Sequence, residues 1–142
     1  MIDYEKLQKS LKHLELQYSN YQTLDSDQPR LIQEAVAESV IQRFETCYDM
    51  LWKVLKRYLI EELGIPEVPN SPKPIVRLAN ENGLLTSPVE QWIAYANARV
   101  GTAHDYSGDK AQAALELMEE FLADAITLYQ TMSHQPWIQP AP

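Results

Sequence analysis

Cysteine, glycine and basic side chains are scarce in this chain of 142 residues. Only four glycines are present, and they form neither a Gly-rich phosphate-binding loop nor a Gly-x-Ser-x-Gly nucleophile elbow. The single cysteine, Cys47, excludes an internal disulfide and a site built from paired cysteines. It lies within a long helical pattern, so we expect a buried thiol in a protein kept in a reducing compartment.

Positive charge is in the minority. Twelve Lys and Arg stand against 20 Asp and Glu, which gives a net charge of −8. This balance argues against general DNA or RNA coating, because phosphate binding draws on clustered cations, and any RNA or nucleotide contact must be local. No apolar run approaches the roughly 18 residues of a membrane span, and the N-terminus lacks a signal-peptide core. We therefore expect a soluble, cytoplasmic protein with no membrane contact.

Metal and nucleotidyl-transfer motifs are also absent. The paired Glu-x-x-His motif of di-metal helical bundles does not occur, and neither does a Gly-Ser followed by an Asp pair, as in polymerase-type nucleotidyltransferases. We expect no metal and no cofactor, and we do not expect this chain to transfer nucleotides by itself.

Apolar residues recur every three or four positions over most of the chain, which predicts helices. The first stripe runs from Leu7 to Tyr21 and fades in a cluster of turn formers that ends at Pro29. Residues 30–63 contain no Gly or Pro and predict a helix of about 45 Å at 1.5 Å per residue. Gly64 should end it.

Capping signals divide the second half. Four prolines in residues 66–74 predict a stiff connector, and Ser71 should cap a short helix that ends at Gly83. Ser87, Pro88 and Glu90 predict the start of the next helix through a capping box, and Gly101 is a candidate for its end.

One last long helix is predicted from about residue 109 to 132, followed by a flexible tail over residues 135–142. With 45% hydrophobic residues and no strand-like alternation, the chain should form one domain over residues 1–134. The predicted class is all-α, an antiparallel up-and-down four-helix bundle with one extra short helix.

The sequence from Arg99 to Tyr106 is the best candidate for chemistry. It reads Arg, four residues, His104, one residue, Tyr. Arg binds phosphate bidentately and His titrates near neutral pH, so the pair has the groups needed to hold a phosphodiester and move its protons. Alternatively, both side chains merely lie at the C-terminal end of a helix, where the helix dipole stabilises cations. In an unbroken helix the two side chains would lie about 140° apart. They converge only if the helix ends near Gly101 or if two subunits bring their copies together.

Two stretches together resemble the nucleotidyltransferase substrate-binding proteins, a bacterial and archaeal branch of the HEPN superfamily. The long helix carries Gln42, Arg43, Phe44, Glu45, Tyr48, Leu51, Trp52, Lys53, Lys56, Tyr58 and Leu59. Arg99 to Tyr106 matches the Arg-x-x-x-x-His-x-Tyr element of that branch. Ser71 to Leu84, Glu90 and Trp92 also fall where such proteins have similar residues, and the likeness covers most of residues 3–130.

The resemblance implies a helical homodimer with Arg and His of both subunits in a shared cleft. It also implies a partner, a minimal nucleotidyltransferase encoded nearby, in some cases as a toxin–antitoxin pair in which the toxin cuts RNA without metal. Transferred by position, Arg99 would hold the scissile phosphate, His104 would exchange protons, and Tyr106 would accept a regulatory adenylyl group. Val100 stands where the family most often has a polar residue, typically Asn, and this departure weakens the case for catalysis.

Three functions remain open at this point. The first is a nucleotide- or RNA-binding subunit of the nucleotidyltransferase, using Arg99, His104, Lys53 and Lys56. The second is a metal-independent endoribonuclease that uses Arg99 and His104. The third is a scaffold in which these cations are caps and solvated side chains whose stems cover apolar neighbours.

Overall fold

The computed structural model describes residues 1–104 and 108–138, and within them the chain has six helices and no strand. The helices are α1 (Glu5–Thr23), α2 (Arg30–Glu61), α3 (Pro72–Glu81), α4 (Val89–His104), α5 (Asp109–Glu116) and α6 (Met118–Ser133). The predicted all-α class is confirmed. None of these helices is long and apolar enough to cross a bilayer.

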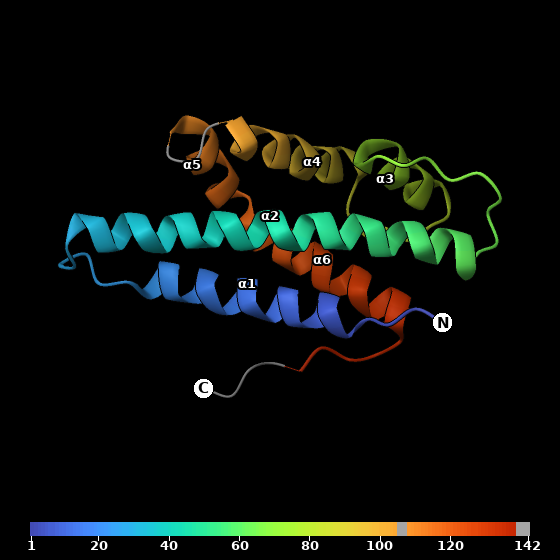
Figure 1. The fold of residues 1–142 in the computed structure, drawn as a ribbon, viewed down its shortest axis with the longest axis horizontal. Helices are drawn as coiled ribbons and strands as arrows, with labels where there is room; N and C mark the ends of the chain where they lie inside the picture. Colours follow the sequence, from blue (N-terminus) through green and yellow to red (C-terminus); the bar gives the residue numbers. More distant parts are fainter. Residues whose placement is uncertain (105–107, 139–142) are drawn as a thin grey trace.

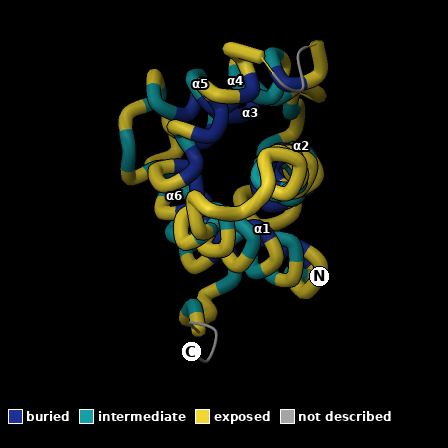
Figure 2. Tube along the Cα trace, turned by 90° about the vertical axis from the view of Figure 1, so that its left-hand side faces the viewer, coloured by how far each residue is buried: buried dark blue, intermediate teal, exposed yellow. Residues whose placement is uncertain are grey.

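Helix α2 is the central element of the fold. It contacts all five other helices, with α1 and α6 on one side and α3, α4 and α5 on the other (Figures 1 and 2). Its 32 residues correspond to about 48 Å. Gly64 follows the helix with a φ of 68°, a left-handed conformation that suits glycine and ends the helix as the sequence predicts.

The core is formed by the apolar stripes that the sequence shows. Leu7, Leu11 and Leu14 of α1 are fully buried where this helix packs on α2. An aromatic contact joins α2 to α6, with the rings of Phe44 and Phe121 edge to face at 5.0 Å. Tyr95 of α4 packs on Phe121 in the same way at 5.2 Å. Such contacts fix α2, α4 and α6 to one another.

The predicted single last helix is wrong, because α5 and α6 are separate helices that meet at Leu117. The Leu117 amide donates to the Ala114 carbonyl at 3.0 Å, a tighter turn than an α-helix makes. No Gly or Pro marks this position. The break has a tertiary cause, since α5 packs on the end of α4 whereas α6 crosses to pack on α1 (Figure 1). The count of helices is therefore six instead of five.

The segment after α6 lies against the helices over residues 135–138. The Trp137 ring packs edge to face on Tyr129 at 5.5 Å, and the Lys12 ammonium lies 5.7 Å from the Trp137 ring centre. Trp137 of the predicted tail therefore docks on its own chain. The rest of the predicted tail, residues 139–142, lies outside the described residues.

Candidate functional site

Arg99 lies on the side of α4 that faces α2, and its guanidinium binds two carboxylates there. Its Nε and Nη2 donate to the two oxygens of Asp49 at 3.1 and 3.0 Å, and Nη1 donates to Glu45 Oε2 at 3.0 Å. The side chains are 26% exposed for Arg99, 15% for Glu45 and 41% for Asp49. The paired N–H donors of Arg99, which the sequence predicts to bind phosphate, are thus occupied by Asp49. A phosphate must compete with that carboxylate, the more exposed of the two.

Thr102 completes this cluster. Its side chain is fully buried, and its hydroxyl lies 2.9 Å from Glu45 Oε2 and 3.0 Å from the Arg99 carbonyl oxygen. Both neighbours are acceptors, so the single hydroxyl proton is shared between them. Glu45 therefore accepts from Arg99 and Thr102 at once, and this ties the last turn of α4 to the middle of α2.

The predicted helix end at Gly101 is wrong, since α4 continues to His104. The buried Thr102 holds the chain in helical register beyond the glycine. A Cβ added at Gly101 would lie 3.5 Å from Lys110 of α5, an ordinary contact, so packing does not require the glycine. With the helix unbroken, Arg99 faces α2 while His104 is exposed about 140° around the axis. One subunit therefore does not bring the two side chains together.

The structure separates Lys53 from Lys56. Lys53 is exposed, lies 5.8 Å from the centre of its neighbour Trp52, and lines a cavity of about 410 Å³ together with Asp49. Lys56 donates to the Asn70 side chain at 3.0 Å and so fixes the proline-rich connector to α2. Lys53 thus lies beside the Arg99 cluster, and Lys56 has a structural contact that explains its presence.

Tyr48 is buried next to the same cluster. Its hydroxyl has no hydrogen-bond partner among the residues that the structure describes. Burial raises the pKa of Tyr48 well above its usual value, the Asp49 carboxylate adds to this, and the Arg99 cation opposes it. A neutral phenol at this position adds no charge to the cluster, whose one cation and two carboxylates sum to −1.

A second polar cluster fixes the start of α4. The Ser87 and Tyr95 hydroxyls donate to the two oxygens of Asp124 on α6, and Gln91 donates to the Tyr95 hydroxyl at 3.2 Å. Burial and the bond to Asp124 raise the pKa of Tyr95. The Ser87 side chain, expected to cap α4, instead joins that helix to α6. Both ends of α4 are therefore held by polar contacts to other helices.

Sequence reasoning did not identify Glu45, Asp49 and Thr102 as members of the site. Glu45 and Asp49 are four residues apart, so they share one face of α2, and that spacing is the signal available in the sequence. Which cation they would meet depends on the packing of α4, 50 residues later. Tyr106, the expected regulatory residue, lies outside the described residues. Within residues 1–104 and 108–138, no group of three His, Cys, Asp or Glu side chains could hold a metal ion.

Comparisons with known proteins assign the chain to a family. Residues 2–134 match the family described as nucleotidyltransferase substrate binding protein like. A relative from Haemophilus influenzae, named probable ribonuclease HepT, is 29% identical over 125 residues, which cover 87% of this chain and 84% of the relative.

Solved structures show the same fold. A Haemophilus influenzae structure, described as the fold of a substrate-binding domain of a nucleotidyltransferase, superposes with a TM-score of 0.82 at 25% identity, covering 92% of this chain and 99% of the other. A crystal structure from Thermus thermophilus gives a TM-score of 0.69 at 26% identity, covering 90% and 97%. The family match spans nearly the whole chain and the fold agrees with it, so this protein belongs to the nucleotidyltransferase substrate-binding protein family.

Proposed function

We propose that the chain is the nucleotide- or RNA-binding partner subunit of a minimal nucleotidyltransferase, in a pair of the toxin–antitoxin type. The family assignment supports the partner. The observation that carries the site is the end of α4, where a positioned guanidinium on Arg99 precedes an exposed imidazole on His104 by five residues. These are the groups that bind a phosphate and exchange its protons.

A homodimer completes the proposed site. Helix α4 is continuous, so Arg99 and His104 meet only if the α4 helices of two subunits lie side by side. Val100 is 57% exposed and lies on the same face as the exposed Ala103, so a second copy that covers these apolar groups buries them. In an antiparallel pair centred between Arg99 and His104, each arginine lies opposite the partner's histidine. Within each subunit, the four helices of the proposed bundle are α1, α2, α4 and the pair of α5 and α6 taken together.

The charge of the Arg99 cluster limits how strongly it attracts a phosphate. Asp49 and Glu45 already neutralise the guanidinium, and the cluster has a net charge of −1, so a phosphate gains less from Arg99 than from an isolated cation. Lys53, one helical turn from Asp49, supplies compensating positive charge in the same cavity. A nucleotide presented by the nucleotidyltransferase would arrive with its own counterions and need only this modest contribution.

Co-expression with the nucleotidyltransferase encoded nearby tests the partnership. We expect one complex that co-elutes in size-exclusion chromatography at micromolar concentration. Arg99→Gln should weaken AMP binding to that complex about tenfold in calorimetry, since one charge-assisted contact contributes roughly 1.5–3 kcal/mol. Arg77→Gln, the same change at an exposed position on α3, is the control. Separate elution of the two proteins refutes the partnership, and equal AMP affinity in both variants refutes the site.

A second candidate is a metal-independent endoribonuclease with Arg99 and His104 as catalytic residues, favoured by the relative named probable ribonuclease HepT. In this reaction the imidazole takes the 2′-hydroxyl proton, the oxygen attacks phosphorus, and the leaving 5′-oxygen is protonated, which yields a cyclic phosphate. The test is RNA cleavage in EDTA by the purified protein. Cyclic phosphate ends that disappear in His104→Ala support it, and cleavage that survives this substitution refutes it.

A further inference from the structure

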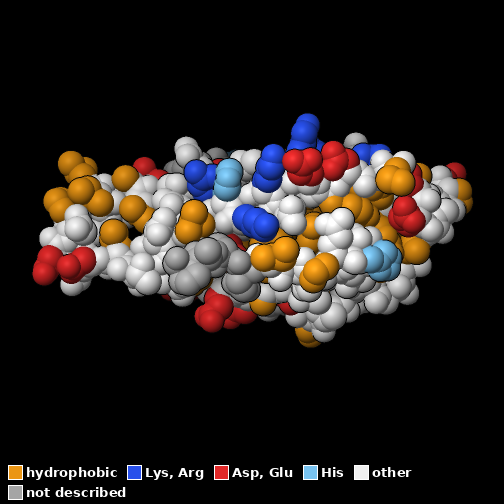
Figure 3. Space-filling view, turned by 90° about the horizontal axis from the view of Figure 1, so that it is seen from below, with side chains coloured by type: hydrophobic (Ala, Val, Ile, Leu, Met, Phe, Trp, Pro, Cys, Tyr) orange, Lys and Arg blue, Asp and Glu red, His pale blue; other side chains and the backbone are white. Residues whose placement is uncertain are grey.

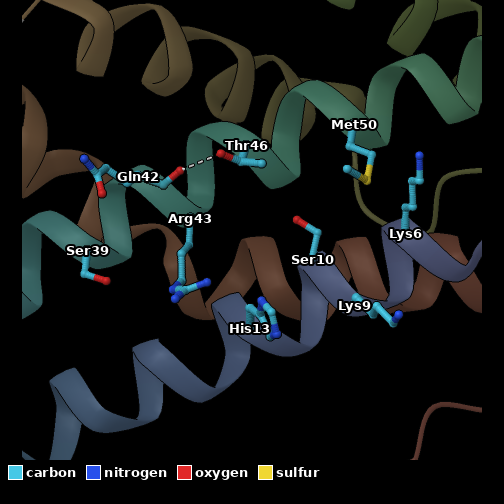
Figure 4. Close-up of a pocket in the computed structure, with 9 residues that line it drawn as sticks. All are labelled: Lys6, Lys9, Ser10, His13, Ser39, Gln42, Arg43, Thr46 and Met50. Atoms are coloured by element: carbon cyan, nitrogen blue, oxygen red, sulfur yellow. Dashed lines mark hydrogen bonds between the residues drawn. The ribbon is translucent and has the colours of Figure 1, made fainter.

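A second cavity, separate from the Arg99 cluster, lies between α1 and α2. It has a volume of about 490 Å³ and opens on the outer surface of the two helices (Figure 4). Its lining residues are Lys6, Lys9, Ser10, His13, Ser39, Gln42, Arg43, Thr46 and Met50. Neither the family assignment nor the proposed site uses this cavity.

The charge of this cavity is opposite to that of the protein. Lys6, Lys9 and Arg43 line it together with His13, and no carboxylate does. Figure 4 shows Arg43 reaching from α2 toward His13 on α1. Lys9 pairs with Glu5 at 3.2 Å on the surface, whereas Lys6 and Arg43 form no ion pair with any described residue. In a chain of net charge −8, a cavity without acidic lining is a local site for anions.

The uncharged lining indicates which part of an anion is recognised. Ser10, Ser39, Gln42 and Thr46 present hydroxyl and amide groups, and Met50 is the one apolar residue of the lining. His13 is the one aromatic side chain of the lining, and no Phe, Tyr or Trp ring is present on which a base would stack. Hydroxyls and amides suit phosphate and ribose oxygens. The lining therefore fits a sugar–phosphate backbone.

The cationic surface continues along α2. The neighbouring cavity of about 410 Å³ shares Thr46 and Met50 with the first and adds Lys53 and Arg57. It also contains the Asp49 carboxylate, and Arg57 pairs with Glu61 at 2.8 Å. One face of α2 carries Arg43, Thr46, Met50, Lys53 and Arg57 at spacings of three or four positions, over about 21 Å at 1.5 Å per residue. Figure 3 shows Lys and Arg side chains and a His along one edge of the face that it presents, with Asp and Glu side chains among them. A run of this length spans several phosphates, because phosphates of one stacked strand rise roughly 3.4 Å each.

We propose that the groove formed by the cavity between α1 and α2 and by its continuation along α2 binds the phosphate backbone of single-stranded RNA without base specificity. Arg43 and Lys6 are its principal cations, and Lys9, Lys53 and Arg57 extend it. The proposal rests on the proposed function in that it takes RNA as the ligand, and it adds the cavity between α1 and α2, whose continuation along α2 reaches Asp49 of the Arg99 cluster. A groove of this kind would position RNA of any sequence.

The test is titration of the full chain against a fluorescein-labelled 12-nucleotide RNA, followed by anisotropy at several KCl concentrations from 50 mM upward. Arg43→Gln should weaken binding about fivefold to tenfold, and the double change Lys6→Gln with Lys9→Gln should weaken it at least as much. The slope of log affinity against log salt should fall by about 0.7 for each phosphate that the variant no longer neutralises, a readout that a change in folding alone does not produce. Arg77→Gln, with the same loss of charge on α3, should stay within twofold of the unsubstituted chain.

Several outcomes overturn the proposal: no RNA binding by the unsubstituted chain at 50 mM KCl, unchanged binding in Arg43→Gln, or an equal loss in Arg77→Gln. Loss of co-elution with the nucleotidyltransferase in Arg43→Gln, with RNA binding intact, assigns the groove to protein docking and also overturns it. The RNA titration uses this chain alone. A failed partnership with the nucleotidyltransferase therefore shows in chromatography and leaves the result for the groove readable.

Discussion

The carboxylates that hold Arg99 also oppose any anion that approaches it, so Asp49→Asn should change stability and binding in opposite directions. Asp49 accepts hydrogen bonds from Nε and Nη2 of Arg99, at 3.1 and 3.0 Å, and its side chain is 41% exposed. Because solvent screens a pair of this exposure, we expect a loss of about 1 kcal/mol in the free energy of unfolding. That corresponds to a melting temperature lower by about 3 °C for a chain of this size.

Anion binding should improve in the same variant. A carboxylate about 6 Å from a bound phosphate, in surroundings of effective dielectric constant near 50, repels it by ~1 kcal/mol, or about fivefold in affinity. Glu45→Gln should cost more stability, about 2 kcal/mol, because Glu45 is 15% exposed and also binds Thr102. The ratio of the change in unfolding free energy to the change in anion affinity should therefore differ between Asp49→Asn and Glu45→Gln.

Differential scanning fluorimetry and calorimetric titration with AMP at low ionic strength measure both quantities. Glu38→Gln is the matched control, since it removes one charge from an exposed position of α2 about 16 Å away along the axis. The reasoning fails if Asp49→Asn binds AMP more weakly than the unsubstituted chain. It also fails if Arg99→Met, which removes the cation and keeps the aliphatic stem, melts within 1 °C of it.

Four further substitutions test the packing. Tyr48→Phe should leave the free energy of unfolding unchanged or raise it by up to about 1 kcal/mol, because the lost hydroxyl has no partner among the described residues. Tyr95→Phe breaks a hydrogen bond to a carboxylate and should lower the free energy of unfolding by about 1 kcal/mol. Urea titrations measure both. Gly101→Ala should stabilise by up to about 1 kcal/mol in thermal unfolding, because it raises helix propensity and its Cβ meets Lys110 at an ordinary 3.5 Å. Burial raises the pKa of the Cys47 thiol to about 12. Between the unfolded value of 9.0 and that value only the unfolded thiol ionises, so stability should fall with pH by up to about 1.4 kcal/mol per unit, and Cys47→Ala should reduce this slope.

Each of these expectations has an opposite result that would contradict it. A Gly101→Ala variant destabilised by more than about 1 kcal/mol would indicate a left-handed residue, and hence a helix that ends there after all. Tyr48→Phe destabilised as much as Tyr95→Phe would imply a partner for the buried hydroxyl. An alkaline slope that is the same with and without the thiol would assign the loss of stability to tyrosines alone, among which burial raises the pKa of Tyr4 to about 12.

Helix boundaries were predictable where local chemistry sets them. The limits of α1, α2 and α3 follow from an apolar period interrupted by a breaker such as Gly64 or Gly83, both of which adopt positive φ. The break at Leu117 was not predictable in this way. It has no local signal and arises because α5 and α6 pack on different helices. The same holds for Gly101, because the contact of Thr102 with Glu45 on another helix, which has no local signal, holds the chain in the helix beyond the glycine.

The site was half predictable for the same reason. Periodicity places Arg99 on the flank of the buried face of α4, yet it does not say what lies opposite. Asp49 and Glu45 become its partners only when α4 is laid across α2, a contact between residues 50 and 54 positions apart. The resemblance named the family that the comparison with the family model confirms. The roles that it assigned to Arg99, His104 and Tyr106 stay predictions.

Because α2 carries residues of both the Arg99 cluster and the cationic groove, charges at one of them interact electrostatically with charges at the other. Arg43 and Asp49 are six residues apart on α2, about 9 Å along its axis. The Debye length at physiological ionic strength is about 8 Å, so solvent ions attenuate the field between them without abolishing it. An RNA strand seated on α1 and α2 would therefore raise the negative potential felt at Asp49 and Arg99, and dilute buffers would amplify that influence.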